Sequence, residues 1–128
     1  MAEPVTLAPF RRPLVGRRFR LEPDTGSPAR LKVIRLADRE PVGTATIEEL
    51  SPNTLLISSL CIDAEHRGYG AGSEAAELLL AAAAGVYEKI RTWAPPNLGL
   101  AVYFWVRMGL SPLHGEGPEG GLWFERRR

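Results

Sequence analysis

The sequence is poor in the residues that build disulfides and metal centres. Its 128 residues include one cysteine, Cys61, and two histidines, His66 and His114. A single cysteine excludes an internal disulfide. One cysteine and two histidines are too few ligands for us to expect a structural zinc site. We therefore expect no metal in this protein.

Long apolar runs and an excess of charge of either sign are also missing. The longest apolar run, Leu78 to Ala84, is far too short to span a bilayer, and residues 1–13 have no apolar stretch typical of a signal peptide. The formal net charge of +1 gives no overall attraction to nucleic acid or to a membrane surface. We expect neither partner and interpret the protein as soluble and cytoplasmic.

The composition is that of an ordinary globular domain. Hydrophobic residues make up 45% of the chain and charged residues 24%, which suits one compact core at this length. We predict a single domain over residues 1–128. Residues 1–13 carry several prolines and arginines without a clear period, so they are predicted to form an irregular N-terminal arm.

Strand patterns occupy the first half of the chain. Charged and apolar residues alternate over residues 17–22 and 31–36, and two further strand-like segments follow at 42–50 and 54–63. Turn-forming residues separate these segments. Four strands joined by short turns predict an antiparallel meander.

Helix formers dominate the second half. Alanine, leucine and glutamate crowd residues 72–89, where Glu74, Glu77 and Glu88 are expected on a polar face and Gly85 offers an early end. The later elements are predicted as a strand at 90–94, a helix at 97–108, and strands at 110–114 and 122–126.

A long helix between the fourth and fifth strands requires a crossover, which favours parallel pairing of those two strands. The predicted fold is therefore α/β of the α+β type. It has a mixed, mostly antiparallel central sheet of about six to seven strands, with two main helices late in the chain.

Three glycines separate the fourth strand from the first long helix. Gly68, Gly70 and Gly72 let the backbone bend tightly and approach a ligand closely. The first amides of a helix lack intrahelical partners and, with the helix dipole, form an anion site. Ser73 adds a hydroxyl group and Arg67 a permanent charge. Residues 60–73 thus predict a pyrophosphate site, the alternative being a turn without a ligand.

Two familiar phosphate motifs do not fit this turn. A P-loop has Lys-Ser/Thr after its last glycine, whereas Gly72 precedes Ser73 and Glu74. A Rossmann turn follows the first strand of a parallel sheet, whereas this turn follows a meander.

Two segments resemble the GNAT superfamily of N-acetyltransferases. Arg67-Gly-Tyr-Gly70-Ala-Gly72 resembles the family's Arg/Gln-x-x-Gly-x-Gly/Ala turn, which also opens the first long helix after strand four. A second stretch resembles the family's late helix through Ala101, Phe104, Arg107, Gly109 and Leu110. The resemblance covers about residues 42–108.

This resemblance implies acetyl-CoA as the acyl donor and direct transfer of its acetyl group to a primary amine. The acceptor would be the amine of a small molecule, a peptide or a protein. The amide of Ile62 would polarise the thioester carbonyl, a form of oxyanion stabilisation. The implied cofactor-binding residues are Leu60, Ile62, Arg67, Gly68, Tyr69, Gly70, Ala71, Gly72, Ser73 and Asn97.

The catalytic residues depart from the family pattern. Trp105 occupies the position of the usual tyrosine acid, and an indole cannot protonate a leaving thiolate. Tyr103 is the nearest phenol, but it lies about 200° around the helix, so it is either a displaced acid or a packed aromatic. Cys61, on an apolar strand, is interpreted as an inert core residue, with a role as an acylated nucleophile as the alternative.

A general base is not evident from the motifs. Glu48 is the candidate we select, although Glu49, Asp63, Glu65 and His66 also fit by position or chemistry. A solvated surface acid is the competing interpretation of each carboxylate.

The interval at residues 23–30 is too short for the helices that the family usually places between its first two strands. The acceptor side is therefore expected to be open, unless the N-terminal arm or a homodimer partner closes it. Two other functions stay open: a CoA-binding module without catalysis, and an interaction domain whose glycine turn binds nothing.

Overall fold

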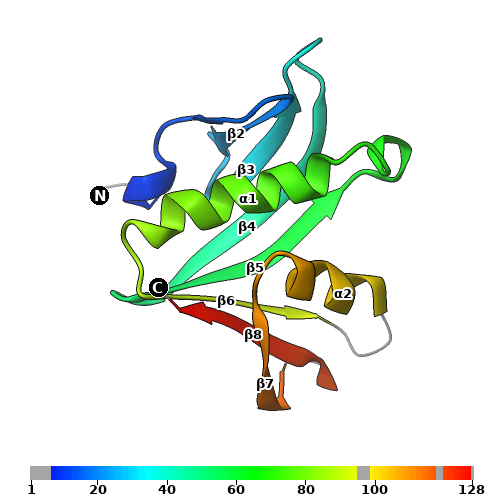
Figure 1. Ribbon diagram of the computed structural model, residues 1–128. Coiled ribbons are helices and arrows are strands. Elements are labelled where there is room, and N and C mark those ends of the chain that lie inside the picture. The colour runs from blue at the N-terminus through cyan, green and yellow to red at the C-terminus, as the bar shows by residue number, and fades with distance from the viewer. Residues whose placement is uncertain (1–6, 95–98, 118–119, 128) are drawn as a thin grey trace.

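The chain folds around one sheet, as the computed structural model of residues 7–94, 99–117 and 120–127 shows (Figure 1). Two α-helices accompany the sheet, α1 (Ala71–Ala84) and α2 (Gly99–Arg107). The short 3₁₀ helices η1 (Ala8–Phe10) and η2 (Ala64–His66) lie before the first strand and before the glycine turn. The strands are β1 (Leu14–Val15), β2 (Phe19–Asp24), β3 (Ser27–Arg35), β4 (Pro41–Ser51), β5 (Thr54–Ile62), β6 (Lys89–Ala94), β7 (Ser111–Glu116) and β8 (Leu122–Arg127).

The spatial order of the strands is β1-β2-β3-β4-β5-β6-β8-β7. β2 to β5 form the four-stranded antiparallel meander that the sequence predicts, and β1, which it does not predict, pairs with β2 at the edge. α1 then crosses over so that β6 pairs with β5 in parallel. β8 and β7 complete the sheet in antiparallel fashion. The predicted α+β fold is confirmed, with eight described strands in place of six to seven.

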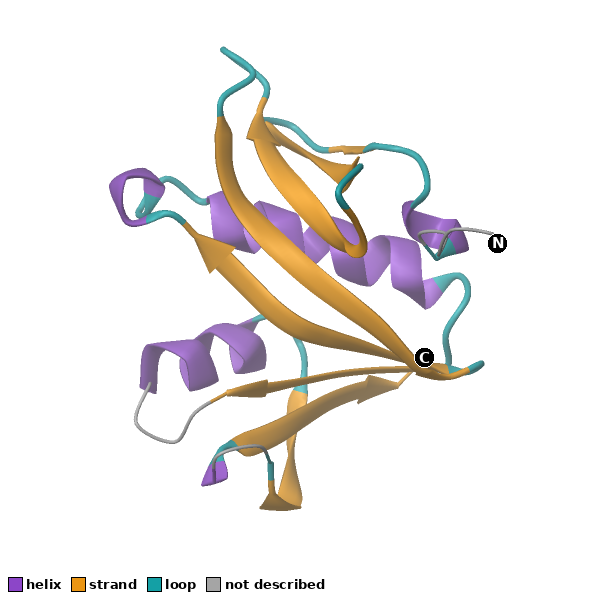
Figure 2. Cartoon of the chain, turned by 180° about the vertical axis from the view of Figure 1, so that it is seen from behind, coloured by secondary structure: helices purple, strands orange, loops and turns teal. Residues whose placement is uncertain are grey.

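The core lies between α1 and one face of the sheet. Alternate residues of the strands point toward the helix, among them Leu21, Val33 and Ile57, and Leu79 of α1 packs against this layer; all four are buried. The opposite face of the sheet is seen in Figure 2, where α1 lies beyond the strands. No helix among the described residues is both long and apolar enough to cross a membrane.

The N-terminal arm, predicted as irregular, has local structure in the residues from Leu7 onward that the structure describes. Residues Ala8–Phe10 form η1, and the side chain of Phe10 is completely buried in the core. A single large aromatic anchors this segment, and one such residue creates no periodic pattern that a sequence analysis could use.

Helix α1 ends at Ala84, and Gly85, where the sequence allowed an early end, is its C-cap. The amides of Val86 and Tyr87 both bond to the carbonyl of Ala83, at 3.0 and 2.8 Å, which closes the last turn. The chain then has a short route to β6, so the predicted helix at 72–89 is too long at its C-terminal end.

Candidate cofactor site

Strand β5 loses one of its neighbours part-way along its length. It pairs with β6 only from Thr54 to Ile57, whereas its pairing with β4 continues to Ile62. Between Ile57 and Ser59 the register with β4 shifts, which leaves Ser58 as the extra residue of a β-bulge. The bulge bends the strand, so residues 58–62 keep β4 on one edge and open the other edge toward α2.

The backbone amides of two predicted site residues face this opened edge. The amide of Asp63 donates to the carbonyl of Val42 at 2.9 Å, so it points toward β4. Because successive amides of a strand alternate between its two edges, those of Leu60 and Ile62 point away from β4. They are available to an extended chain of a ligand.

The glycine turn directs further amides toward the same place. Gly68 and Gly70 both have positive φ, +88° and +84°, a conformation that suits glycine. Gly70 is the N-cap of α1 and, as a glycine, has no side chain that could cap the helix. The first turn of α1 therefore presents the amides of Ala71, Gly72 and Ser73 without intrahelical acceptors.

Two guanidinium groups add positive charge at this turn. Arg67 donates from Nε to the carbonyl of Ile62 at 2.9 Å, and Arg107 donates from Nη2 to Oγ of Ser73 at 3.0 Å. The sequence indicates Arg107 only as part of the late-helix motif and does not predict its place at the site. Its position three residues after Phe104 on the same helix was the available signal.

These elements surround one groove of about 650 Å³. Such a volume suits a cofactor-sized ligand. The lining residues come from β5, the glycine turn, α1 and α2: Leu60, Cys61, Ile62, His66, Arg67, Gly68, Gly70, Ala71, Gly72, Ser73, Ala101, Phe104, Trp105 and Arg107.

The groove thus brings together the predicted cofactor residues between Leu60 and Ser73, with the exception of Tyr69. The side chain of Tyr69 is 66% exposed and lines a neighbouring hollow. Asn97 lies outside the described residues.

Aromatic side chains of α2 form the apolar wall of the groove. Trp105 is buried, and its ring meets that of Phe104 edge-on, with centroids 5.0 Å apart and planes at 83°. Tyr103 is 63% exposed and is not among the lining residues. The guanidinium of Arg107 lies 5.9 Å from the centre of its ring, so Tyr103 is a surface residue of α2 and does not pack into the core.

The candidate bases of β4 also lie apart from the groove lining. Glu48 is exposed. Glu49 accepts a hydrogen bond of 2.7 Å from the hydroxyl of Tyr87. Burial, followed by this bond, raises the pKa of Tyr87 to about 12. His66 does line the groove, and its Nε2 lies 3.6 Å from a carboxylate oxygen of Glu65.

Two sequence interpretations near the site are wrong. Cys61 is exposed and lines the groove, because the bulge at Ser58 reverses the alternation of β5, so that Leu60 packs against the core and Cys61 lies on the opposite face of the sheet. Glu74 belongs to no polar face: it is 9% exposed, and its Oε2 accepts the amides of Arg18 and Phe19 at 2.9 and 2.7 Å. Among the described residues, no group of three His, Cys, Asp or Glu side chains could hold a metal ion.

Comparison with known families agrees with this geometry. A model of the acetyltransferase (GNAT) family matches residues 6–109, which include β1 to β6, the glycine turn and α2. The chain belongs to the GNAT family. It is accordingly an acyltransferase, as the glycine turn and the late helix indicated. A search of curated proteins finds no match.

Solved GNAT structures share the fold at low sequence identity. An acetyltransferase from Bacillus anthracis is 16% identical with a TM-score of 0.72, covering 81% of this chain and 68% of its own. A GNAT acetyltransferase from Elizabethkingia anophelis with acetyl-CoA bound is 13% identical, with a TM-score of 0.62 and coverages of 77% and 75%. Arabidopsis thaliana Naa50, in complex with the bisubstrate analogue CoA-Ac-MVNAL, is 16% identical with a TM-score of 0.65 and coverages of 77% and 72%. This chain spans only 65% and 56% of two longer matched structures.

Proposed function

We propose that this protein transfers the acetyl group of acetyl-CoA to a primary amine by direct attack. The observation that carries the proposal is the meeting of the opened edge of β5 with the glycine turn in a single groove. An extended pantetheine arm needs the first feature and a pyrophosphate needs the second.

The phosphates fit at the start of α1. The amides of Ala71, Gly72 and Ser73, together with Arg67 and Arg107, supply donors and positive charge for them. The pantetheine arm then runs along β5, where the amides of Ile62 and Leu60 pair with it in the manner of an added strand. The acetyl-CoA bound to the Elizabethkingia anophelis relative supports the choice of this donor.

The same two amides serve the reaction. As the amine attacks the thioester, negative charge develops on the carbonyl oxygen, and a preorganised amide at β5 stabilises it. We assign this role to Ile62, with Leu60 as the equivalent donor farther from the turn. The C–S bond of the tetrahedral intermediate then breaks, and coenzyme A leaves as a thiolate.

Proton transfer in this site involves water. Trp105 lines the groove, but its indole N–H is too weak an acid to protonate a thiolate. The candidates Tyr103 and Glu48 lie exposed outside the lining. We therefore propose that water protonates the thiolate, and that the proton of the amine passes to water or to His66, which lines the groove.

The acceptor reaches the thioester from an open side. β2 and β3 join in a tight hairpin, in which the amide of Gly26 bonds to Oδ1 of Asp24 at 2.9 Å. No helix lies between these two strands, so the acceptor, a small amine or an amine of a peptide or protein, meets little steric restriction from them. Closure by a second subunit in a homodimer would narrow this choice.

A titration followed by a thiol assay tests the proposal. Acetyl-CoA is expected to raise the melting temperature by mass action, and free thiol is expected to appear with at least one member of an amine panel. Desulfo-CoA, which cannot donate an acetyl group, is the control for binding alone. No shift with either compound would refute the assignment of the cofactor.

Trp105 favours one other function, that of a CoA-binding module without catalysis, because it replaces the usual acid. That function predicts the same thermal shift and no thiol release with any amine of the panel. The two measurements together therefore separate the candidate functions.

A further inference from the structure

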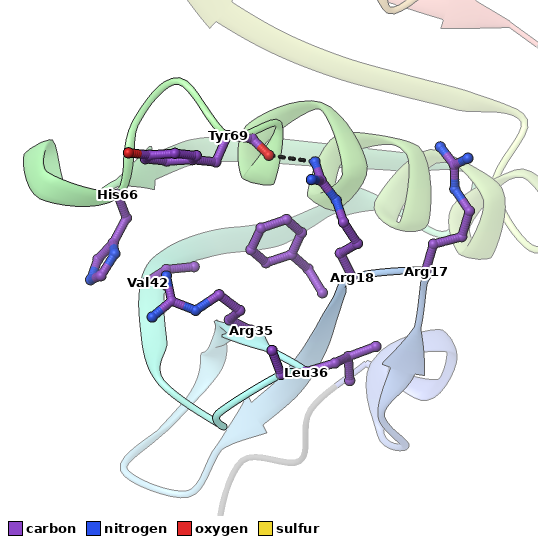
Figure 3. A pocket seen from close by; sticks show the side chains of 9 residues that line it. Arg17, Arg18, Arg35, Leu36, Val42, His66 and Tyr69 are labelled. Atoms are coloured by element: carbon purple, nitrogen blue, oxygen red, sulfur yellow. Dashed lines mark hydrogen bonds between the residues drawn. The ribbon is translucent and has the colours of Figure 1, made fainter.

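A second hollow lies beside the cofactor groove and shares His66 with it. It has a volume of about 470 Å³. Its walls are the start of β2, the chain leaving β3, the start of β4 and the glycine turn (Figure 3). The lining residues are Arg17, Arg18, Phe19, Arg35, Leu36, Ala37, Val42, His66 and Tyr69.

The charge of this hollow has one sign. Three arginines and one histidine line it, and none of the lining residues is acidic. Arg35 is compensated by Asp38, which accepts bonds of 2.9 and 2.6 Å from its Nε and Nη2. Within the described residues, neither Arg17 nor Arg18 has a carboxylate partner for its side chain. A ligand with an oxyanion would supply the missing countercharge.

Two of the basic side chains, those of Arg18 and Arg35, are held in place before any ligand arrives. Arg18 donates from Nη2 to the backbone oxygen of Tyr69 at 2.5 Å (Figure 3), and the two bonds to Asp38 fix Arg35. A guanidinium has more N–H groups than these bonds use. Because the side chains are already ordered, a ligand loses less affinity to the cost of immobilising them.

The floor of the hollow is apolar. Phe19 and Val42 lie beneath it, 4% and 0% exposed, and the guanidinium of Arg18 lies over the Phe19 ring, 5.7 Å from its centre. The apolar surface that a ligand can reach therefore comes from half-buried Leu36 and from Tyr69. The ring of Tyr69, largely exposed, forms one wall. Such a surface favours a ligand with a flat or branched apolar body over a bare inorganic anion.

We propose that this hollow binds a small organic carboxylate with an aromatic or branched body. Its carboxylate pairs with Arg18 and Arg17, and its body packs against Leu36 and Tyr69. This site is separate from the acetyl-CoA groove, and the proposal does not depend on acetyl transfer.

Calorimetric titration with three probes that share a naphthyl ring tests the proposal on the whole chain. 1-Naphthylacetate is expected to bind with a Kd of about 1 mM or tighter, as its size and the charge pairing suggest. 1-Naphthylmethylamine, with the same ring and the opposite charge, is expected not to bind. 1-Naphthyl phosphate separates the two oxyanion chemistries, and a phosphate that binds about tenfold more tightly than the carboxylate would overturn the carboxylate assignment.

Two variants locate the binding. Arg17→Met and Arg18→Met are each expected to weaken 1-naphthylacetate about tenfold, the usual effect of losing one charge-assisted contact. Arg30→Met is the control, because Arg30 is exposed on β3 and lines neither hollow. Thermal melts of all variants show whether they fold, and unchanged affinity in both Arg17→Met and Arg18→Met would overturn the proposal.

Competition experiments test whether the hollow instead binds part of the cofactor. Saturating desulfo-CoA and adenosine 3′,5′-bisphosphate are expected to leave the 1-naphthylacetate site available. If either displaces the probe competitively, and Arg17→Met weakens desulfo-CoA to the same extent, the hollow holds the nucleotide end of the cofactor and the proposal is wrong.

Discussion

The carboxylate of Glu74 accepts a hydrogen bond from the backbone amide of Phe19 at 2.7 Å. The same Oε2 accepts the amide of Arg18 at 2.9 Å, so one buried acid joins the first turn of α1 to the start of β2. Gly16 is required beside it, because a Cβ at that position would collide with Oε2. The contact sets the helix start, and with it the glycine turn, against the meander.

Replacing this acid is expected to destabilise the fold. Glu74→Leu leaves two amides without their acceptor, at a cost of about 2–3 kcal/mol in the free energy of unfolding. Glu74→Gln keeps a carbonyl oxygen and is expected to lose about half of that. Urea denaturation measures both values, and Glu77→Leu on the exposed face of α1 is the control. Equal stability of Glu74→Leu and Glu77→Leu would contradict the structural role of the contact.

Gly72 allows the charge at the phosphate site to be tested apart from bulk. A Cβ at Gly72 would lie 3.7 Å from Cγ1 of Ile62 and 3.9 Å from Cε1 of Phe104, which is ordinary contact. Gly72→Asp is expected to weaken acetyl-CoA about 100-fold, because a carboxylate there faces the pyrophosphate. Gly72→Asn has nearly the same shape without the charge and is expected to lose about tenfold. Equal affinities of the two variants for acetyl-CoA in calorimetry would show that the pyrophosphate does not bind at this turn.

The sequence predicted those parts of the fold that depend on local patterns. Alternation and turn residues located the meander, and the glycines at 68, 70 and 72 marked the start of α1. The parallel pairing of β5 with β6 followed from the length of the crossover alone.

The errors arose where tertiary contacts decide. Glu74 has the sequence environment of a surface acid, and only the fold brings the amides of Arg18 and Phe19 to it across more than 50 positions. Cys61 lies in an apolar segment, but the bulge at Ser58 turns Leu60 toward the core and Cys61 to the opposite, exposed face of the sheet. No local pattern encodes a contact between distant segments or the place of a bulge, so neither environment could be predicted.

Arg107 is expected to contribute to phosphate binding through its place beside Ser73. Arg107→Met should weaken acetyl-CoA about tenfold and reduce the dependence of its affinity on salt. S-acetylpantetheine lacks the pyrophosphate, so its affinity should stay the same. Arg126→Met, at an exposed position of β8, is the control, and a loss for S-acetylpantetheine as large as that for acetyl-CoA would indicate a merely structural effect.

Removing the hydroxyl group of Tyr103 tests whether this residue is the acid that protonates the thiolate. Because its side chain is exposed and outside the groove lining, Tyr103→Phe is expected to change kcat by less than about twofold. A fall of about tenfold or more, with KM for acetyl-CoA unchanged, would establish Tyr103 as the acid that protonates the thiolate. Glu48→Gln, measured in the same assay, gives the corresponding test for Glu48, the base selected from the sequence, and it is likewise expected to change kcat by less than about twofold.

Glu125 is expected to make stability depend on pH in the acid range. Its carboxylate, 6% exposed, accepts bonds from Arg91 at 2.8 Å and from Arg127 at 2.9 Å. Burial alone would raise the pKa of Glu125, but the bonds from Arg127 and Arg91 outweigh it and lower the pKa. A lowered pKa in the folded state means that the ionised form stabilises the fold above the unfolded-state pKa of about 4.3.

This contribution is lost as the pH falls through the lowered pKa of the folded state. Glu125→Gln is therefore expected to cost about 1–2 kcal/mol at neutral pH, and the difference from the unmodified protein should shrink below about pH 4. Urea denaturation across this range measures the difference, with Glu77→Gln as the control for an exposed acid. A constant difference from neutral to acid pH would show that Glu125 stabilises the sheet by packing, because only an interaction of the ionised carboxylate disappears on protonation.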